Sequence, residues 1–351
     1  MLEKVTGEIG SSGWGRAEHL KKTSEVILMI RAYKTRNEIT METSSLDEED
    51  LWIDLVNPTE DEILEISSRF GIKTEYLMAP LDYDESSRIE TVSQLILILV
   101  NIPKMEHKEM PVMYNTVPLG IVITDGMVIT VSLEENQLIE ELLKTKSKID
   151  TGNRMHFVLQ LLYNNAMLFL RYLKDIDKMS TGIEQNVRKS LRNEELIKLL
   201  NLEKSLVYFS TSLRSNEFVL ERFRRHYLRH VREERSMISV GVLKQDEDDM
   251  DFLEDVIIEN KQAIDMADIY SNILGNTMDA FATIISNNLN IVMKFLAIVT
   301  VVLAIPAIVT SFYGMNVPLP YQRFPLTYLG IVVLSCLMMI ALAILINKKR
   351  S

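Results

Sequence analysis

Two long apolar runs near the C-terminus constrain the fold of this chain more than any other feature. Residues 295–312 form 18 consecutive positions without a charged side chain, and residues 326–346 form another 21. An α-helix needs roughly 20 apolar residues to cross a hydrocarbon layer. Two such runs in succession predict a pair of transmembrane helices, and two buried helices of a soluble core are the weaker interpretation.

The basic residues around these runs predict their orientation. Lys294 precedes the first run and residues 348–350 (KKR) follow the second, whereas the connecting segment 313–325 carries only Arg323. Cytoplasmic flanks of membrane spans are enriched in Lys and Arg. We therefore expect a multi-pass protein of the cell membrane with both termini in the cytoplasm. The first residues, MLEKVTGEIG, contain no apolar signal segment, so we expect no secretion of the large N-terminal part.

The charge distribution excludes some partners and suggests others. The net charge of −11 argues against a nucleic-acid partner. Residues 246–279 hold eleven acidic side chains and one basic one, Lys261, while residues 219–235 hold six arginines and two histidines. Each block is either a solvated helix face or, because an acidic stretch repels itself, a site for counter-ions. These counter-ions would be the basic helix from Arg222 to Arg235, a divalent metal, or both.

The first 150 residues have the pattern of an α/β domain. Their apolar runs are short, rich in β-branched residues and bounded by turn formers, which is typical of strands. Thr59 and Glu62 form a capping box before EILEISSRF, and Gly71 is placed to end that helix. A second helix is expected over residues 133–148. Strands are predicted over residues 26–33, 51–55, 94–102, 117–124 and 127–132.

After Arg154 the strand signals stop and helical periodicity takes over. It extends to about Ile238, breaks at SVGVLKQ and resumes near Asp248, with no proline from there until Pro306. We therefore expect an α+β membrane protein, in which a long stalk helix continues into the first of two C-terminal transmembrane helices. The expected divisions are a cytoplasmic α/β domain (1–150), a helical cytoplasmic region (151–290), a pore-lining transmembrane helix (291–313), an extracytoplasmic loop (314–325), a second transmembrane helix (326–346) and a basic cytoplasmic tail (347–351).

The long helix carries a seam of polar or small side chains, alternately four and three residues apart. Neighbours of the seam, such as Leu289 and Leu303, are bulky and apolar. Small residues alone would allow close packing of transmembrane helices, but a polar stripe entering a bilayer favours a water-filled axis shared by several copies. Two spans cannot enclose a pore, so this interpretation requires a homo-oligomer. The seam comprises Asp279, Thr283, Ser286, Asn290, Met293, Ala297, Thr300, Ala304, Ala307 and Ser311.

Catalytic motifs are weak or incomplete, so we do not expect an enzyme. The sequence contains no phosphate-binding P-loop motif, and GSSGWG at residues 10–15 lacks the spacing of a dinucleotide-binding turn. His226 and His230 are four residues apart, but YLR between them lacks the glutamate of a metalloprotease helix. These histidines are interpreted as part of the basic helix face.

The tetrapeptide YGMN at residues 313–316 lies at the end of the first apolar run. In that position, before a second span with a basic tail and after a large acidic region, it resembles the signature of the CorA family of magnesium channels. The resemblance is firm from about Asp248 to the end and extends more loosely to LDYDESSRIE at residues 81–90. In the N-terminal sheet it rests on order and length alone.

This resemblance implies a homopentamer in a lipid bilayer whose first spans line a pore for Mg²⁺, and for Co²⁺ or Ni²⁺ as further candidates. Gly314 and Met315 would shape the turn that presents Asn316 as a ring of amide oxygens at the outer mouth. Mg²⁺ releases its water reluctantly, so neutral amides would bind its hydration shell without holding the ion too tightly for conduction.

The resemblance also implies roles for residues on the stalk. Asn290, Met293 and Leu296 would form a narrow, partly apolar constriction, with Asp279 as a polar ring below it. Asp255 matches an acidic position that in the family helps to bind regulatory Mg²⁺ between subunits, with Asp82 or Asp84 as the candidate partner. Ala307 departs from the family, in which a threonine is frequent at that position.

Three functions remain open from the sequence. The first is a Mg²⁺ channel driven by the membrane potential and gated by cytoplasmic Mg²⁺. The second is a zinc transporter of the same superfamily. The third is a membrane-anchored interaction protein, although a simple anchor would need neither the polar seam nor the GMN ring.

Overall fold

The computed structural model describes residues 30–36, 39–92, 95–106, 113–144, 149–189, 193–232, 247–315 and 326–348. The chain divides into two compact units, Met1–Gly275 and Asn276–Ser351. Helix α7, Glu247–Tyr313, contributes residues to both units. The division at Gly275 places the helical residues from 154 to 275 in the same unit as the sheet.

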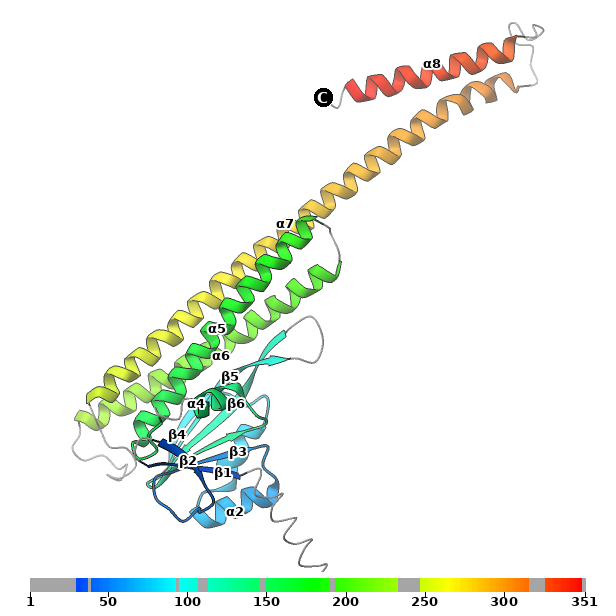
Figure 1. The fold of residues 1–351 in the computed structure, drawn as a ribbon. Coiled ribbons are helices and arrows are strands. Elements are labelled where there is room, and N and C mark those ends of the chain that lie inside the picture. The colour runs from blue at the N-terminus through cyan, green and yellow to red at the C-terminus, as the bar shows by residue number, and fades with distance from the viewer. Residues whose placement is uncertain are drawn as a thin grey trace, which may run out of the picture. The chain divides into compact units, whose positions relative to one another are not determined.

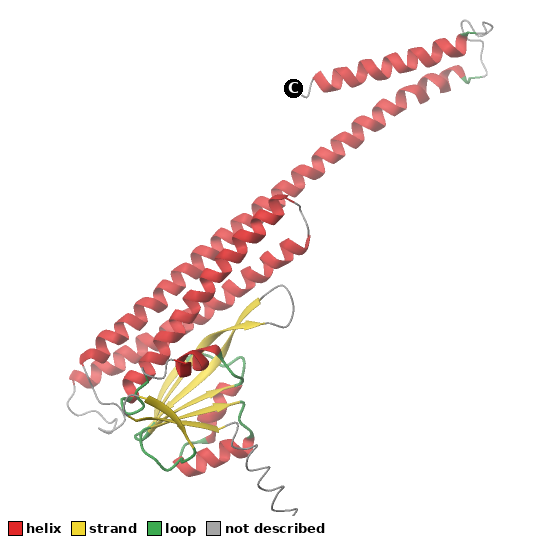
Figure 2. Cartoon of the chain, viewed as in Figure 1, coloured by secondary structure: helices red, strands yellow, loops and turns green. Residues whose placement is uncertain are grey.

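The first unit is built on one β-sheet (Figure 2). It has seven strands in the order β2-β1-β3-β7-β6-β5-β4. β3 and β7 pair in parallel, and every other neighbouring pair among the described strands is antiparallel. Since parallel neighbours need a long crossover connection, the segment between β3 and β7 carries helices and a three-strand meander. The strands are β1 Ile30–Arg36, β2 Ile39–Thr43, β3 Leu51–Val56, β4 Arg88–Val92, β5 Leu95–Glu106, β6 Met113–Ile123 and β7 Met127–Ser132.

Short helices cover one face of the sheet and long helices contact the other (Figure 1). The first face buries a cluster that includes Leu51, Ile53 and Leu55 of β3 against Ile66 and Leu77. These helices are α2 Glu60–Phe70, α3 Thr74–Met78 and the 3-10 helix η1 Ala79–Leu81. The other helices of the unit are α4 Gln137–Lys144, α5 Arg154–Lys189 and α6 Asn193–Arg232.

Helix α2 confirms the capping prediction in detail. The main-chain N–H of Glu62 donates to Thr59 Oγ1 at 3.3 Å, and the N–H of Thr59 donates to Glu62 Oε2 at 2.7 Å. Gly71 closes the helix with φ 68°, a left-handed conformation in which a Cβ would be strained.

The predicted strands near β3 and β7 are confirmed, and the others differ in their ends. β5 ends four residues after its predicted end, and β6 begins four residues before its predicted start. The reason is that the two strands pair as one long hairpin, from Ile96↔Ile123 to Glu106↔Met113. Residues 26–29 of the first predicted strand lie outside the described residues, and β1 ends at Arg36. The two edge strands, β2 and β4, were not predicted. Both are five residues long and only partly buried, so their apolar signal is weak.

The helix predicted over residues 133–148 is wrong at its start, since α4 begins at Gln137. Asn136 Oδ1 accepts the N–H of Ile139 at 2.9 Å, so Asn136 caps the helix and residues 133–136 form the turn before it. Residues 145–148 are not among the described residues. The helical stretch after Arg154 is two contacting helices, α5 and α6, instead of a single run.

The prediction of a long helix beginning near Asp248 is confirmed by α7, which has 67 residues and contains Pro306. Within the first unit its buried face includes Leu253, Val256 and Ala263. Asn260 Nδ2 donates to the carbonyl of Leu213 at 3.1 Å, which ties α7 to α6. The second unit contains the rest of α7 and α8, Thr327–Lys348.

Candidate ion pathway and acidic loop

The predicted seam lies on one face of α7. The helix is continuous from Asp279 to Ser311, and 32 residues at 100° each return to within about 40° of the starting direction. The seam residues therefore share one face of the helix, and Leu289 and Leu303 lie on neighbouring faces.

A stretch of α7 in the second unit is exposed all round. Every residue from 282 to 297 is exposed in the single chain. Large apolar side chains are among the most exposed, with Leu289 at 61% and Phe295 at 62%. A contiguous apolar surface of this kind marks contact with another chain or with lipid. It is not the surface of a helix that functions alone in water.

Two hydroxyls of the seam are already satisfied as donors. Thr283 Oγ1 donates to the carbonyl of Asp279 at 3.0 Å, and Thr300 Oγ1 donates to the carbonyl of Leu296 at 2.8 Å. Their oxygen lone pairs remain available as acceptors. This arrangement suits water or a hydrated cation, whose outer hydrogens are donors.

Pro306 modifies α7 near its end. Proline has no N–H, so the carbonyl of Val302 loses its usual helical donor. Thr310 Oγ1 donates to the carbonyl of Pro306 at 2.8 Å, and the N–H of Gly314 donates to the carbonyl of Thr310 at 2.9 Å. Of the GMN motif, Gly314 and Met315 are exposed just after the helix end at Tyr313. Asn316 lies outside the described residues.

Membrane-spanning capacity differs between the two helices of the second unit. Within the part of the chain that the structure describes, α7 is the one helix long and apolar enough to cross a membrane, with a mean hydropathy of 2.6 over its best 18 residues. The described apolar stretch of α8 is shorter, Tyr328–Leu342. The second predicted span therefore stays a prediction.

The candidate regulatory residue Asp255 is exposed on α7, opposite the face that buries Leu253 and Val256. It makes no ion pair with any described residue. The described ion pairs between α6 and α7 are different ones: Lys261 Nζ lies 3.7 Å from Glu221 Oε1 and 3.9 Å from Glu217 Oε1, and Arg214 contacts Asp268. The arginines expected to balance the acidic block do not do so among the described side chains, and those from residue 226 to 235 fall outside this set.

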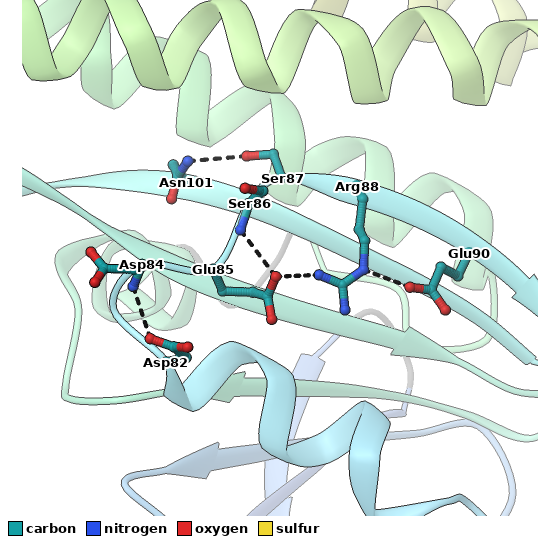
Figure 3. Close-up of polar contacts among 8 residues, drawn as sticks. All are labelled: Asp82, Asp84, Glu85, Ser86, Ser87, Arg88, Glu90 and Asn101. Carbon is teal, nitrogen blue, oxygen red and sulfur yellow. Dashed lines mark hydrogen bonds and ion pairs between the residues drawn. The ribbon is translucent and has the colours of Figure 1, made fainter.

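Asp82 and Asp84 lie on the turn between η1 and β4 (Figure 3). Asp82 Oδ1 accepts the main-chain N–H of Asp84 at 3.0 Å, so one candidate carboxylate is used to fold the turn that carries the other. Arg88 then contacts both Glu85 and Glu90, which neutralises the next two acids along the segment. Only the Asp82 and Asp84 carboxylates of this segment are free of a basic partner within the described residues.

A buried amide network ties this segment to α6, and it was not predicted. Asn216 Oδ1 accepts Ser87 Oγ at 3.1 Å and the N–H of Asn101 at 2.8 Å, while Asn216 Nδ2 donates to the carbonyl of Asn101 at 2.7 Å. Asn101 Nδ2 donates to Ser87 Oγ at 3.1 Å (Figure 3). The one sequence signal was a lone asparagine in the apolar run LILILVNI.

The described residues of one chain contain no group of three or more His, Cys, Asp or Glu side chains that could hold a metal ion. Asp82 and Asp84 share a turn, but Asp255 is not grouped with them. The resemblance places the regulatory Mg²⁺ site between subunits, so the described residues of a single chain leave Asp255, Asp82 and Asp84 as predicted ligands.

The comparisons with known proteins agree with this architecture. A family model described as CorA-like Mg²⁺ transporter protein matches residues 47–349. The cobalt/magnesium transport protein CorA of Methanocaldococcus jannaschii is 28% identical over 271 residues, which are 76% of this chain and 80% of the relative. The magnesium transport protein CorA of Helicobacter pylori is 20% identical over 318 residues, which are 86% and 91% of the two chains.

Among solved structures, the complete structure of the CorA magnesium transporter from Methanocaldococcus jannaschii matches with a TM-score of 0.74 and 24% identity, covering 90% of this chain and 96% of that one. The fold therefore defines a class of proteins in which an N-terminal α/β domain is followed by a very long helix with an apolar C-terminal part. The chain belongs to the CorA-like Mg²⁺ transporter family.

Proposed function

We propose that this protein is a homopentameric membrane channel that admits Mg²⁺ to the cytoplasm, driven by the membrane potential. Family membership and relatives named as magnesium or cobalt/magnesium transport proteins support the choice of cargo. The single observation that carries the proposal is the exposed surface of α7 over residues 282–297, where a polar seam is flanked by large exposed apolar side chains.

The exposed surface of α7 supports assembly of several copies. In one chain the exposed apolar side chains around Met293 and Leu296 would face water, which is unfavourable by about 25 cal/mol per Å² of apolar area. Packing of several α7 helices buries the flanks of the seam and leaves its polar atoms around a common axis. The outer flanks, followed by α8 as the second span, would contact lipid, with both termini in the cytoplasm.

Selection of the ion is assigned to the GMN segment. In the proposed pentamer Asn316 supplies a ring of neutral acceptors for the hydration shell of Mg²⁺, positioned by Gly314 and Met315, which follow the helix end at Tyr313. Asn290, Met293 and Leu296 form the constriction, and Asp279 attracts cations on the cytoplasmic side. Carboxylates at the mouth would bind a divalent ion more firmly and slow its exit.

Flux into liposomes tests the proposal. Purified protein is reconstituted with a Mg²⁺-sensitive dye inside, equal Mg²⁺ on both sides and a K⁺ gradient with an ionophore that sets the potential. Two charges crossing 100 mV gain about 4.6 kcal/mol, so Mg²⁺ should enter only when the interior is negative. Entry at zero potential would indicate a coupled transporter, and no entry at any potential would favour the membrane-anchored interaction protein. Zn²⁺ flux faster than Mg²⁺ flux would favour the zinc transporter.

A further inference from the structure

A carboxylic acid lies in the buried centre of the sheet. Asp54 is the only charged residue of β3, LWIDLV, and it is 0% exposed. Its neighbours Ile53 and Leu55 belong to the apolar cluster on the opposite face of the sheet. Buried carboxylates are rare without a charged partner because desolvation opposes ionisation.

The hydrogen bonds around Asp54 come from neutral groups. Trp52 Nε1 donates to Thr130 Oγ1 at 2.9 Å, and Thr130 Oγ1 donates to Asp54 Oδ1 at 2.7 Å. Asp54 Oδ2 is buried and has no hydrogen-bond partner among the described residues. A single hydroxyl donor does not replace the water that an ionised carboxylate would lose.

The basic side chain whose charge acts on Asp54, Arg31, is bonded to another carboxylate. Arg31 of β1 is the cross-strand partner of Asp54, but its guanidinium contacts Glu135, in the segment that precedes α4. The other titratable group facing this position from β1 is Tyr33. Arg31 is therefore within reach of two carboxylates, one buried and one largely exposed, and is bonded to the exposed one.

These surroundings act on the pKa of Asp54 in opposite directions. Burial raises it most, and Glu135 also raises it, whereas the Thr130 hydrogen bond and the charge of Arg31 lower it; the balance is a rise from 3.8 to about 6. The carboxyl thus changes its charge in a range where an exposed aspartate stays ionised.

We propose that Asp54 is a proton-binding site of the α/β domain, and that its protonation decides which carboxylate Arg31 pairs with. When Asp54 is protonated and neutral, Arg31 stays paired with Glu135, the contact that this structure contains. Loss of the proton to solvent places a negative charge beside β1 and draws Arg31 from Glu135 toward Asp54. Trp52 of the same hydrogen-bond chain packs against Phe157 of α5, at 5.1 Å between ring centroids, so the site lies next to the helical layer. This inference does not depend on ion transport.

Infrared difference spectroscopy of the full-length protein in detergent tests the site, because a protonated buried carboxyl has a C=O band apart from the amide bands. The wild type should show a band that is lost with a midpoint near pH 6. Asp54→Asn should remove it, while Asp61→Asn, at an exposed position of α2, should retain it. The proposal would be overturned if the wild type showed, between pH 4.5 and 7.5, no titrating C=O band that is missing in Asp54→Asn.

Two further variants test the exchange of partners and do not require Asp54→Asn to fold. Glu135→Gln removes a negative charge and frees Arg31, so the midpoint should move to lower pH. Thr130→Val keeps the shape but removes the donor to Asp54, so the midpoint should move to higher pH. A midpoint unchanged in Glu135→Gln would exclude the exchange of Arg31, and one unchanged in both variants would exclude Asp54 as the titrating group.

Discussion

Asn216 of α6 and Asn101 of β5 are joined by two hydrogen bonds, one to the main-chain N–H of Asn101 at 2.8 Å and one to its carbonyl at 2.7 Å. The side chain of Asn216 thus occupies the place of a neighbouring strand at this point of β5. Asn216 also accepts a hydrogen bond from Ser87. The segment that carries Asp82 and Asp84 is therefore attached to α6 by the contact between Ser87 and Asn216.

Replacement of Asn216 by Ala should therefore destabilise the first unit. Three hydrogen bonds are lost. The N–H of Asn101 and the hydroxyl of Ser87 lose their acceptor, at about 1–3 kcal/mol for each such group, whereas the carbonyl of Asn101 keeps Asn165 Nδ2 as a donor at 3.0 Å. We expect the Tm to fall by about 5–10 °C, measured by circular dichroism of the protein in detergent. Thr211→Ala, on an exposed part of the same helix, should change the Tm by about 1 °C or less. Equal effects of the two variants would contradict the assignment.

Asp54 predicts a pH dependence of stability. Its pKa in the folded protein, about 6, lies above the ordinary value of 3.8, so the folded state binds the extra proton between these values. Its contribution to stability is therefore lost as pH rises from about 4 to 7, by about 3 kcal/mol in total. Thermal unfolding of wild type and Asp54→Asn at pH 5 and pH 8 measures this. The difference in Tm between pH 5 and pH 8 should be smaller in Asp54→Asn than in the wild type. In Asp61→Asn the difference should be the same as in the wild type.

Asn316→Ala should abolish selective Mg²⁺ uptake without preventing assembly, because the proposed amide ring acts on the ion and not on helix packing. Flux into liposomes and the mass of the detergent complex give the two readouts. Gln322→Ala removes an amide from the same connecting segment and serves as the matched control. Wild-type flux in Asn316→Ala would remove this residue from the selectivity mechanism.

Water access along α7 distinguishes a pore from simple helix packing. In a Cys336→Ser background, small hydrophilic thiol reagents should modify seam variants faster than flank variants, because only the seam faces the proposed axis. Similar rates in the two groups would favour plain packing. The seam set is Thr300→Cys, Ala304→Cys, Ala307→Cys and Ser311→Cys, and the flank set is Val299→Cys, Leu303→Cys and Ile305→Cys.

Asp255→Lys tests control by cytoplasmic Mg²⁺. If Asp255 binds the ion between neighbouring copies, Mg²⁺ should protect the wild-type cytoplasmic region from protease and inhibit its flux, and the variant should lose both effects. Asp265→Lys makes the same charge change at another exposed position of α7 and should retain them. Inhibition by Mg²⁺ that is the same in Asp255→Lys and wild type would exclude Asp255 as the sensor.

Local sequence determined the elements whose signals are contained in a few neighbouring residues. Thr59, Glu62 and Gly71 specify both ends of α2, because capping atoms and a left-handed glycine act within one helical turn. The uninterrupted pattern after Asp248 specified α7 and placed its polar seam on one face, since helix geometry converts spacing into direction. The YGMN segment was sufficient to indicate the family.

Tertiary structure decided what depends on partners distant in the chain. The edge strands β2 and β4 exist because β1 and β5 offer them hydrogen bonds, and their own apolar signal is weak. The network of Asn101 and Asn216 joins residues 115 positions apart. Asp54 could be seen in the sequence as a charge within an apolar strand, but its burial, its single donor Thr130 and the diversion of Arg31 to Glu135 arise only when three strands meet. Spacing acts along one helix or strand, whereas desolvation depends on everything packed around a group.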